Sequence, residues 1–355
     1  MSDYKNQFIE LVGMVVKERA SDMHLSVGRH PTLRISGELV PLVKMPVLTA
    51  ADTEGMASIV LSQAQKDEFE KEKSVDLSYA YEDKARFRVN VFLQKGFISV
   101  AMRLIPAQVE TLEELNLPPF LAEFAKREQG FFMVVGPTGH GKSTTLASMV
   151  EIINRERSEH IITIEDPIEY LFTQDKSIID QREVGHDAAD FASALRAMFR
   201  EDVNVAMIGE MRDAETISAA VTAAETGHLV FSSLHTNSAS QTIDRIIDSF
   251  ASSQQNQIRA QLASALLGVF SQRLVPRVSG GRIPAYELLI ANTAVRNLIR
   301  ENKIHEIDLF IETSSESGMI GLNQSLMDLV RKGEITMETA RAYSLNVKSL
   351  EHLTG

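Results

Sequence analysis

Apolar positions near the start of the chain repeat first with helical and then with strand spacing. Between residues 8 and 15 they recur at helical intervals, which predicts an amphipathic helix ending near Ala20. Residues 32–36 and 39–42 flank Gly37-Glu38, as expected for two strands joined by a tight hairpin turn. Residues 50–72 are predicted to form a helix with one polar side.

Strict alternation predicts a second hairpin over residues 86–104. Arg86-Phe87-Arg88-Val89-Asn90-Val91-Phe92 alternates polar and apolar side chains, Lys95-Gly96 supplies a turn, and residues 97–104 extend again. One face of this hairpin is therefore expected to be buried and the other polar. Residues 1–104 are predicted to form a small N-terminal domain of mixed α/β class.

The pattern changes after a proline-containing segment at residues 105–120, which we interpret as an interdomain linker. Downstream, short apolar runs alternate with helical stretches, a pattern typical of a parallel sheet covered by helices. The predicted strands are residues 131–135, 161–164, 205–208 and 229–232. We expect residues 121–291 to form an α/β domain and residues 292–355 a helical C-terminal appendage, with a helix ending at Gly333.

Composition and charge exclude several classes of protein. Of the 355 residues, 44% are hydrophobic and 24% charged, which supports a packed core and excludes a disordered or fibrous chain. The formal net charge of −12 disfavours a strongly basic nucleic-acid binder. The absence of cysteine excludes a disulfide scaffold, a thiolate zinc site and a cysteine nucleophile. No targeting or membrane segment is evident, so we expect a cytoplasmic protein without direct membrane insertion.

One motif carries strong chemical information. Gly136-Pro137-Thr138-Gly139-His140-Gly141-Lys142-Ser143 matches a phosphate-binding loop and stands between a predicted strand and a predicted helix. Its glycines allow backbone N–H groups to surround a phosphate, at which the helix also directs its positive end. The Lys142 ammonium would neutralise phosphate oxygens, and the Ser143 hydroxyl would bind Mg²⁺. The residues predicted to hold ATP are Gly136, Pro137, Thr138, Gly139, His140, Gly141, Lys142, Ser143 and Thr144.

Two predicted strands of the same domain end in carboxylates. Glu210 follows residues 205–208, and Glu165 and Asp166 follow residues 161–164. An acid at this end of a strand beside a phosphate loop is placed to bind Mg²⁺ or to orient a water molecule. Taken singly, each acid is equally compatible with a solvated charge, and Asp166 with turn chemistry. Two acidic strand ends after one phosphate loop together favour the functional interpretation.

Two histidines and two arginines are further candidates whose roles position alone does not decide. His228 precedes and His235 follows a predicted strand, where a polar group would sense the γ-phosphate, although a single histidine is more often a structural hydrogen-bonding group. Arg88 and Arg103 lie on the two strands of the second hairpin. Arginines on a sheet face usually serve solubility, and the alternative is that they act as arginine fingers at a domain or subunit boundary.

Four segments, taken in order, resemble the signatures of the secretion ATPase superfamily, and within it those of the type IV pilus retraction ATPases. They are Gly-Pro-Thr-Gly-His-Gly-Lys-Ser from residue 136, Ile-Thr-Ile-Glu-Asp-Pro-Ile-Glu from residue 162, Gly-Glu-Met-Arg-Asp from residue 209 and Gly-His-Leu-Val-Phe-Ser-Ser-Leu-His-Thr-Asn from residue 227. The resemblance begins at Ser21-Asp22-Met23-His24-Leu25 and reaches residues 294–301, which are similar to a C-terminal motif associated with retraction.

The resemblance implies a role for each matching residue. It implies that residues 136–143 are the Walker A loop and that His228 adds to the nucleotide site. The implied catalytic residues are Glu210 of the Walker B region, Glu165 of the Asp box, His235 of the His box and the N-domain arginines Arg88 and Arg103. The implied ligands of Mg²⁺ are Ser143, Glu165 and Glu210.

The resemblance also implies an assembly and a function. Members form homohexameric rings in which a PAS-like N-terminal α/β domain packs on the RecA-like P-loop ATPase domain of a neighbour, and ATP turnover moves one against the other. The expected function is an Mg²⁺-dependent ATPase that powers type IV pilus retraction and twitching motility. The expected partners are an inner-membrane platform protein, the pilus machinery and an accessory retraction ATPase. The expected location is the cytoplasm, at the inner face of the cytoplasmic membrane.

The chain departs from the family pattern at three places. His140 replaces the more usual serine, Asn204 stands where aspartate is often found, and Ser232-Ser233 replaces a Gly-Thr or Ala-Thr pair. We expect nucleotide binding to survive at His140 because its backbone N–H is retained.

Several other functions compete with the retraction motor. A pilus-assembly or type II secretion ATPase typically carries a further N-terminal domain and often a four-cysteine zinc module, and zero cysteines disfavour it. An accessory retraction ATPase is harder to exclude, but the segments at residues 209–213 and 294–301 favour the principal motor. A RecA-like DNA translocase predicts a basic channel, which the net charge disfavours. A non-hydrolysing nucleotide switch predicts tight ATP binding with negligible turnover, and the presence of Glu165, Glu210 and the arginines disfavours it.

Overall fold

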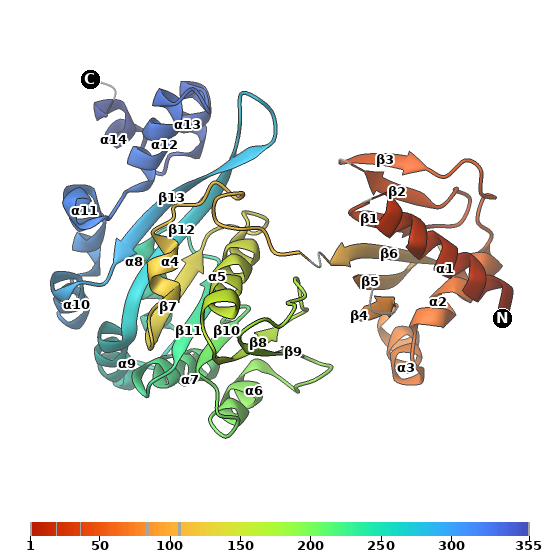
Figure 1. Cartoon of the computed structure of the whole chain (residues 1–355), viewed down its shortest axis with the longest axis horizontal. Coiled ribbons are helices and arrows are strands. Elements are labelled where there is room, and N and C mark those ends of the chain that lie inside the picture. The colour runs from red at the N-terminus through yellow and green to blue at the C-terminus, as the bar shows by residue number, and fades with distance from the viewer. Residues whose placement is uncertain (1, 19, 36, 82–84, 106–107, 354–355) are drawn as a thin grey trace. The chain divides into compact units, whose positions relative to one another are not determined.

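The chain folds into two compact units. The computed structural model describes residues 2–18, 20–35, 37–81, 85–105 and 108–353. One unit comprises Met1–Gln108 with Glu169–Leu171, and the other comprises Val109–Ile168 with Phe172–Gly355 (Figure 1). Each unit has its own hydrophobic core.

The N-terminal unit is a six-stranded antiparallel sheet with the strand order β3-β2-β1-β6-β5-β4. Its described strands are β1 (Asp22–Leu25), β2 (Thr32–Ile35), β3 (Glu38–Pro41), β4 (Ser74–Tyr81), β5 (Ala85–Gln94) and β6 (Phe97–Ile105). Its helices are α1 (Ser2–Lys17), α2 (Ala50–Val60) and α3 (Gln63–Glu72). Helices α1 and α2 contribute side chains to the same core as the apolar face of the sheet.

The predicted hairpin over residues 86–104 is confirmed, and its two faces differ as the alternation requires. Phe87 and Val89 of β5 are buried in the core, whereas Arg88 between them is exposed. Lys95 and Gly96 both have positive φ, 51° and 81°, which is the backbone that a two-residue hairpin turn demands.

The predicted single helix over residues 50–72 is wrong, because the chain makes two helices there. Leu61 is extended and ends α2, and Ser62 starts α3 with a capping box in which Gln65 returns the hydrogen bond. The sequence interpretation also missed β1 and β4, which lie on either side of the second hairpin in the sheet.

The larger unit contains a seven-stranded sheet with the order β13-β12-β7-β11-β10-β8-β9. All neighbouring strands are parallel except the antiparallel pair β12 and β13. The described strands are β7 (Gly130–Val135), β8 (His160–Glu165), β9 (Ile178–Glu183), β10 (Val205–Ile208), β11 (Leu229–Leu234), β12 (Leu266–Pro276) and β13 (Arg282–Ile290). The predicted strands at residues 131–135, 161–164, 205–208 and 229–232 are confirmed.

Helices cover both faces of this sheet (Figure 1). Phe131 and Met133 of β7 face one core and Phe132 the other, so the strand is apolar at every position rather than alternating. The helices are α4 (Leu121–Ala125) and α5 (Lys142–Glu156) on one face, and α6 (Phe191–Met198), α7 (Ala214–Glu225), α8 (Ala239–Asp248) and α9 (Ser252–Ala265) on the other.

Beyond residue 292 the described chain is helical, as predicted. Its elements are α10 (Thr293–Arg300), α11 (Ile307–Thr313), α12 (Leu322–Arg331), α13 (Met337–Tyr343) and α14 (Val347–His352), with short 3₁₀ turns at Ile304–Glu306 and Ser315–Ser317. Leu322, Leu326 and Leu329 share the buried face of α12, and Gly333 has the positive φ, 72°, of a C-terminal cap.

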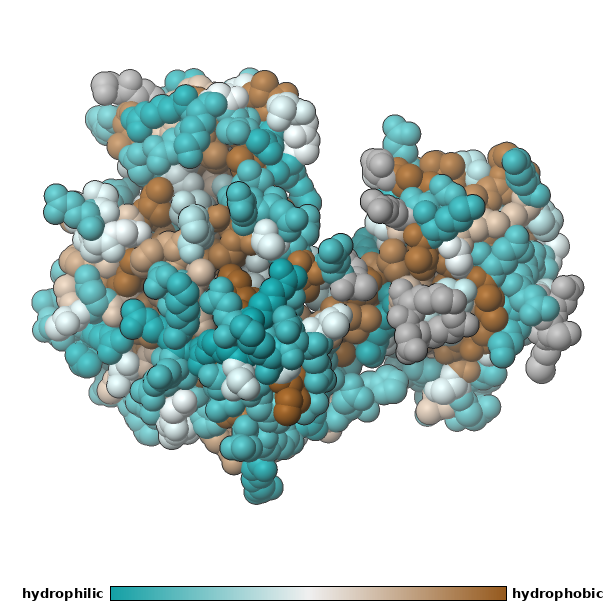
Figure 2. All heavy atoms as spheres, viewed as in Figure 1, coloured by the Kyte–Doolittle hydropathy of each residue, from teal (hydrophilic) through white to brown (hydrophobic). Residues whose placement is uncertain are grey.

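Polar side chains dominate the visible surface of each unit (Figure 2). In the part of the chain that the structure describes, no helix is both long enough and apolar enough to cross a membrane.

Candidate nucleotide site

The phosphate loop connects the end of β7 to the start of α5, as predicted. Gly136, Gly139 and Gly141 all have positive φ, which directs the intervening N–H groups toward one concave surface. A Cβ on Gly136 would lie 2.3 Å from the carbonyl oxygen of Gln272, so only glycine fits there. Lys142 and Ser143 begin α5, whose unsatisfied N–H groups favour an anion.

Lys142 and His235 contact each other next to this loop. The buried Lys142 Nζ donates to the carbonyl oxygens of Gly136 and Pro137 at 3.0 and 3.1 Å and lies 3.3 Å from His235 Nδ1. Thr138 Oγ1 is also 3.3 Å from His235 Nδ1. The structure thus brings the end of β11 against the phosphate loop, as expected for His235.

Glu210 lies on the other side of the same imidazole. Its Oε2 is 3.3 Å from His235 Nε2, and its Oε1 accepts a hydrogen bond from Arg212. Burial raises the pKa of Glu210, but the hydrogen bonds and charges of Arg212 and His235 outweigh burial and leave the pKa below its usual value. His235 therefore links the phosphate-binding cation to a carboxylate that stays charged at neutral pH.

Glu165 ends the neighbouring strand. Strands β8 and β10 are parallel, with Ile164 opposite Ile208, so their carboxyl ends bring Glu165 and Glu210 to the same edge of the sheet. Glu165 is buried, and its Oε1 accepts hydrogen bonds from Thr163 Oγ1 at 2.6 Å and Gln181 Nε2 at 3.4 Å.

Magnesium fits the oxygen donors that the loop and the two strand ends offer. The hydroxyl of Ser143 and the carboxylates of Glu165 and Glu210 are hard ligands of the kind that Mg²⁺ prefers. Among the described residues, no group of three or more His, Cys, Asp or Glu side chains is arranged to hold a metal ion. Mg²⁺ keeps several waters and shares substrate phosphates rather than occupying an all-protein cage, so a sparse donor set suits it.

The structure does not bring His228 to this site. His228 precedes β11 at the amino end, and its carbonyl accepts the N–H of Gly130, the first residue of β7. Six residues separate it from His235, roughly 20 Å along a strand. Its Nδ1 lies 3.0 Å from the Ala223 carbonyl oxygen, and its ring packs edge-on against Phe199. In this structure His228 makes packing and hydrogen-bond contacts at the amino end of β11 and does not line the phosphate loop.

Arg88 and Arg103 are directly opposite each other in the N-terminal unit. They are paired in the β5–β6 register, and Arg103 is in turn paired with Asp22 of β1. Directly opposed residues of antiparallel strands share a face of the sheet, so the three form one row across it. The exposed Arg88 lies on the face that the core does not cover.

Several site residues were not predicted. Gln272 of β12 is 2% exposed; its Nε2 donates to the His140 carbonyl at 2.8 Å and its Oε1 accepts from Thr145 Oγ1 at 2.7 Å. Arg212 belongs to the Gly-Glu-Met-Arg-Asp segment from residue 209, but its hydrogen bond to Glu210 is evident only in the structure. The only sequence signal for Gln272 is its place in the short polar run Ser271-Gln272-Arg273, which interrupts an otherwise apolar segment.

Two departures from the family pattern have structural roles. Asn204 Oδ1 accepts the backbone N–H of His160 at 2.8 Å and so holds the start of β8. The hydroxyls of Ser232 and Ser233 donate to the carbonyls of Ile208 and Gly209 at 2.9 and 2.6 Å, which fixes the end of β10 just before Glu210.

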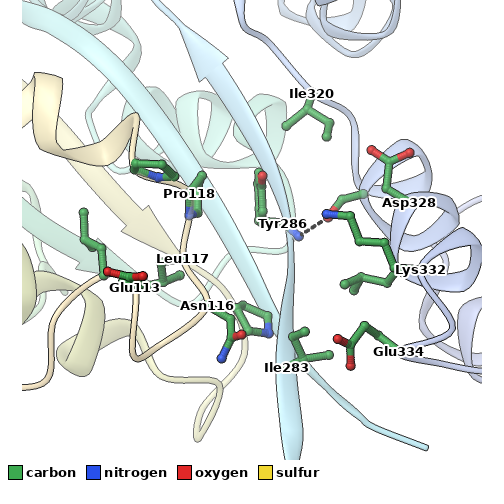
Figure 3. A pocket seen from close by; sticks show the side chains of 15 residues that line it. Glu113, Asn116, Leu117, Pro118, Ile283, Tyr286, Ile320, Asp328, Lys332 and Glu334 are labelled. Atoms are coloured by element: carbon green, nitrogen blue, oxygen red, sulfur yellow. Dashed lines mark hydrogen bonds between the residues drawn. The ribbon is translucent and has the colours of Figure 1, made fainter.

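A separate cavity of about 580 Å³ lies between the segment before α4, strand β13 and helix α12 (Figure 3). Glu113, Tyr286, Asp328 and Lys332 line it, and burial followed by the charge of Asp328 raises the pKa of Tyr286. None of the residues that line it belongs to the phosphate loop.

The chain belongs to the family described as type II/IV secretion system protein, which matches residues 5–302. Together with the phosphate loop and the acidic strand ends, this membership identifies a P-loop ATPase and confirms the predicted resemblance. The type IV pilus retractation ATPase PilT of Pseudomonas aeruginosa is 42% identical over 332 residues, covering 94% of this chain and 96% of that protein. A twitching motility protein of Neisseria gonorrhoeae is 44% identical over 321 residues, covering 90% of this chain and 86% of that protein.

A solved structure confirms the α/β fold class. The crystal structure of the pilus retraction motor PilT with bound ADP superposes with a TM-score of 0.90 at 46% identity, covering 97% of this chain and 98% of that one. ADP is bound in that protein, and its fold is the one described above.

Proposed function

We propose that this chain is a hexameric, Mg²⁺-dependent ATPase that drives the retraction of type IV pili, and thereby twitching motility. The observation that carries the proposal is the connection from Lys142 through His235 to Glu210, with 3.3 Å on either side of the imidazole. Similarity to pilus retraction ATPases over nearly the whole length of both chains supports retraction as the work that this hydrolysis drives.

In the proposed mechanism the phosphate loop binds the nucleotide and Glu210 prepares the water. The N–H groups of the loop and the Lys142 ammonium hold the phosphates. The charged Glu210 accepts a hydrogen bond from water and orients it toward the γ-phosphorus. Mg²⁺, held by Ser143 and through Glu165 and Glu210, would neutralise phosphate charge. His235 contacts both the phosphate loop and Glu210. A movement of the loop would therefore alter the position of Glu210 through the imidazole.

The N-terminal unit supplies the mechanical part of the proposal. The PAS-like domain of residues 1–104 would present Arg88 and Arg103 to nucleotide bound by a RecA-like domain of residues 121–291, and residues 105–120 would link the two. Arginines that bind the γ-phosphate favour the closed state only while that phosphate is present, so hydrolysis reverses the preference. Residues 292–355 would complete the ATPase unit.

The proposed setting follows from the proposed work. A retraction motor acts from the cytoplasm, at the inner face of the cytoplasmic membrane, on a platform protein embedded there and with the rest of the pilus machinery. An accessory retraction ATPase is a further proposed partner. DNA has no part in this proposal, because the net charge of −12 disfavours a polyanion.

Two measurements on the full-length chain test the proposal. We expect phosphate release from ATP and Mg²⁺ that is independent of added DNA and is lost in Glu210→Gln, but not in Glu316→Gln, which changes an exposed glutamate outside the site. In a bacterium whose retraction ATPase gene is deleted, wild type should restore twitching and Glu210→Gln should not. Turnover that rises sharply with DNA would indicate a translocase instead, and turnover without restored twitching would exclude retraction.

A further inference from the structure

His140 makes a side-chain contact that the usual serine is too short to make. Its Nδ1 accepts the backbone N–H of Leu274 in β12 at 2.9 Å. The half-buried ring is therefore turned toward the sheet, while its backbone N–H remains part of the phosphate loop.

The Leu274 N–H needs this acceptor because its strand continues past its neighbour. Strand β7 ends at Val135, opposite Ser271, whereas β12 continues to Pro276. Past Ser271, the phosphate loop rather than β7 meets this edge of β12. Leaving a backbone N–H without a partner in a partly buried position is unfavourable, so an acceptor on the loop is favoured.

Strands β12 and β13 hold the loop at two further points. Gln272 Nε2 donates to the His140 carbonyl at 2.8 Å, and an Arg282 Nη donates to the Gly139 carbonyl at 3.3 Å. Gly141 packs so closely that a Cβ there would lie 2.8 Å from Gln272 Nε2. The position of the nucleotide-binding N–H groups thus depends on β12 and β13, and among these contacts only that of the His140 imidazole is lost when its own acceptor atom takes up a proton.

The imidazole must be neutral to make its bond, because Nδ1 accepts only while it carries a lone pair. Burial first, and then the charges of Arg273 on β12, Arg282 on β13 and Lys142 on its own segment, lower the pKa of His140. All three neighbouring charges are positive, so each disfavours the imidazolium. At pH 7 and above the contact is therefore intact.

We propose that His140 is a positioning residue whose neutral imidazole ties the phosphate loop to β12, so that protonation releases the loop and weakens nucleotide binding. The inference rests on nucleotide binding by this loop and not on pilus retraction. Its sign is definite: affinity is highest while the imidazole is neutral, and it declines as the pH falls through the lowered pKa of His140.

Calorimetric titration of full-length protein with ADP and excess Mg²⁺, at pH 8.0 and 5.8, tests the proposal. We expect the wild-type Kd to rise about threefold or more from the higher to the lower pH. In His140→Asn, Oδ1 occupies the place of Nδ1 but does not titrate, so the ratio of the two Kd values should fall below about 1.5. His305→Asn changes an exposed histidine outside the loop and should keep the wild-type ratio.

Amide hydrogen exchange of the segment around Leu274 gives a second readout. We expect faster exchange in His140→Ala and unchanged protection in His140→Asn, since only the first removes the acceptor.

Three results would overturn the inference. An Asn variant with the wild-type pH ratio would assign the titration to another group, such as His235. Affinity that rises as the pH falls would make the imidazolium a direct phosphate ligand. ADP that fails to bind wild type at either pH would refute the proposed function itself, and this inference with it.

Discussion

Asp22 Oδ1 accepts a hydrogen bond from Arg103 Nε at 2.8 Å, although the two residues are 81 positions apart in sequence. The Asp22 side chain is 10% exposed and that of Arg103 70%. A nearly buried carboxylate therefore binds the Nε of a guanidinium that is otherwise exposed to solvent. Burial raises the pKa of Asp22, but hydrogen bonds from Ser21 and Arg103 and the Arg103 charge leave it below its usual value. Asp22 thus orients Arg103, one of the two proposed arginine fingers. This gives a role to the segment Ser21-Asp22-Met23-His24-Leu25, for which the sequence indicated none.

Removing the charge of Asp22 should impair hydrolysis more than nucleotide binding. In Asp22→Asn the amide still fits but holds Arg103 less firmly, so we expect steady-state phosphate release to fall about tenfold while the Kd for ADP changes by less than about twofold. Asp76→Asn removes an exposed carboxylate from the same sheet and is the matched control. If Asp22→Asn lowered turnover further in an Arg103→Ala background, Asp22 would act independently of Arg103.

Arg88 and Arg103 should each be needed for turnover. Because they are adjacent across β5 and β6, both can reach one polyanion, and loss of either should slow phosphate release by at least ~100-fold. Arg88→Lys keeps the charge but not the forked donor geometry, so partial activity in that variant would distinguish charge from geometry. Arg29→Ala alters an exposed arginine elsewhere in the same unit and serves as the control. Unchanged hydrolysis in both Arg88→Ala and Arg103→Ala would disprove the proposal that these two arginines act as arginine fingers.

Site residues whose positions depend on local spacing along the chain could be predicted from the sequence. Site residues whose positions depend on the order of strands in the sheet could not. The phosphate loop needs only glycines between one strand and one helix, and Glu210 only the end of a strand. Strand β12 was missed because the apolar run from residue 262 to 270 crosses from α9 into β12 without a change in composition. Gln272 was therefore not predicted as a loop contact.

The distance of His228 from the phosphate loop has a physical cause that generalises. In a parallel sheet only residues that follow a strand reach the carboxyl edge, where the phosphate loop lies. His228 precedes β11 and His235 follows it, so the two were never equivalent, although the family motif contains both. The pairing of Asp22 with Arg103 was unpredictable for another reason: it requires β1 to lie beside β6, a matter of sheet order.

Lys142 and Glu210 should separate binding from hydrolysis. Lys142→Ala removes the phosphate-binding ammonium, and we expect no measurable nucleotide binding. Glu210→Gln should bind ATP yet release phosphate at least ~100-fold more slowly, because an amide orients water poorly. Since the Glu210 pKa is lowered, its carboxylate stays charged at acid pH, and kcat should show no loss attributable to Glu210 between pH 8 and about 5. Wild-type turnover in Glu210→Gln would show that the catalytic assignment is incorrect.

Glu287 should make the stability of the ATPase unit depend on pH. Burial in β13 raises its pKa to about 7, with Asp308 and Glu312 adding to the effect and the Ala239 N–H and Arg273 opposing it. Between about pH 4.5 and 7 the folded state keeps a proton that the unfolded state has lost, so stability falls as the pH rises, by about 3 kcal/mol in all. In Glu287→Gln the free energy of unfolding, measured by urea titration, should therefore depend less on pH across this range than in wild type. Glu338→Gln, at an exposed position, should leave the slope as it is in wild type, and an equal slope in the Glu287 variant would assign the pH dependence to other groups.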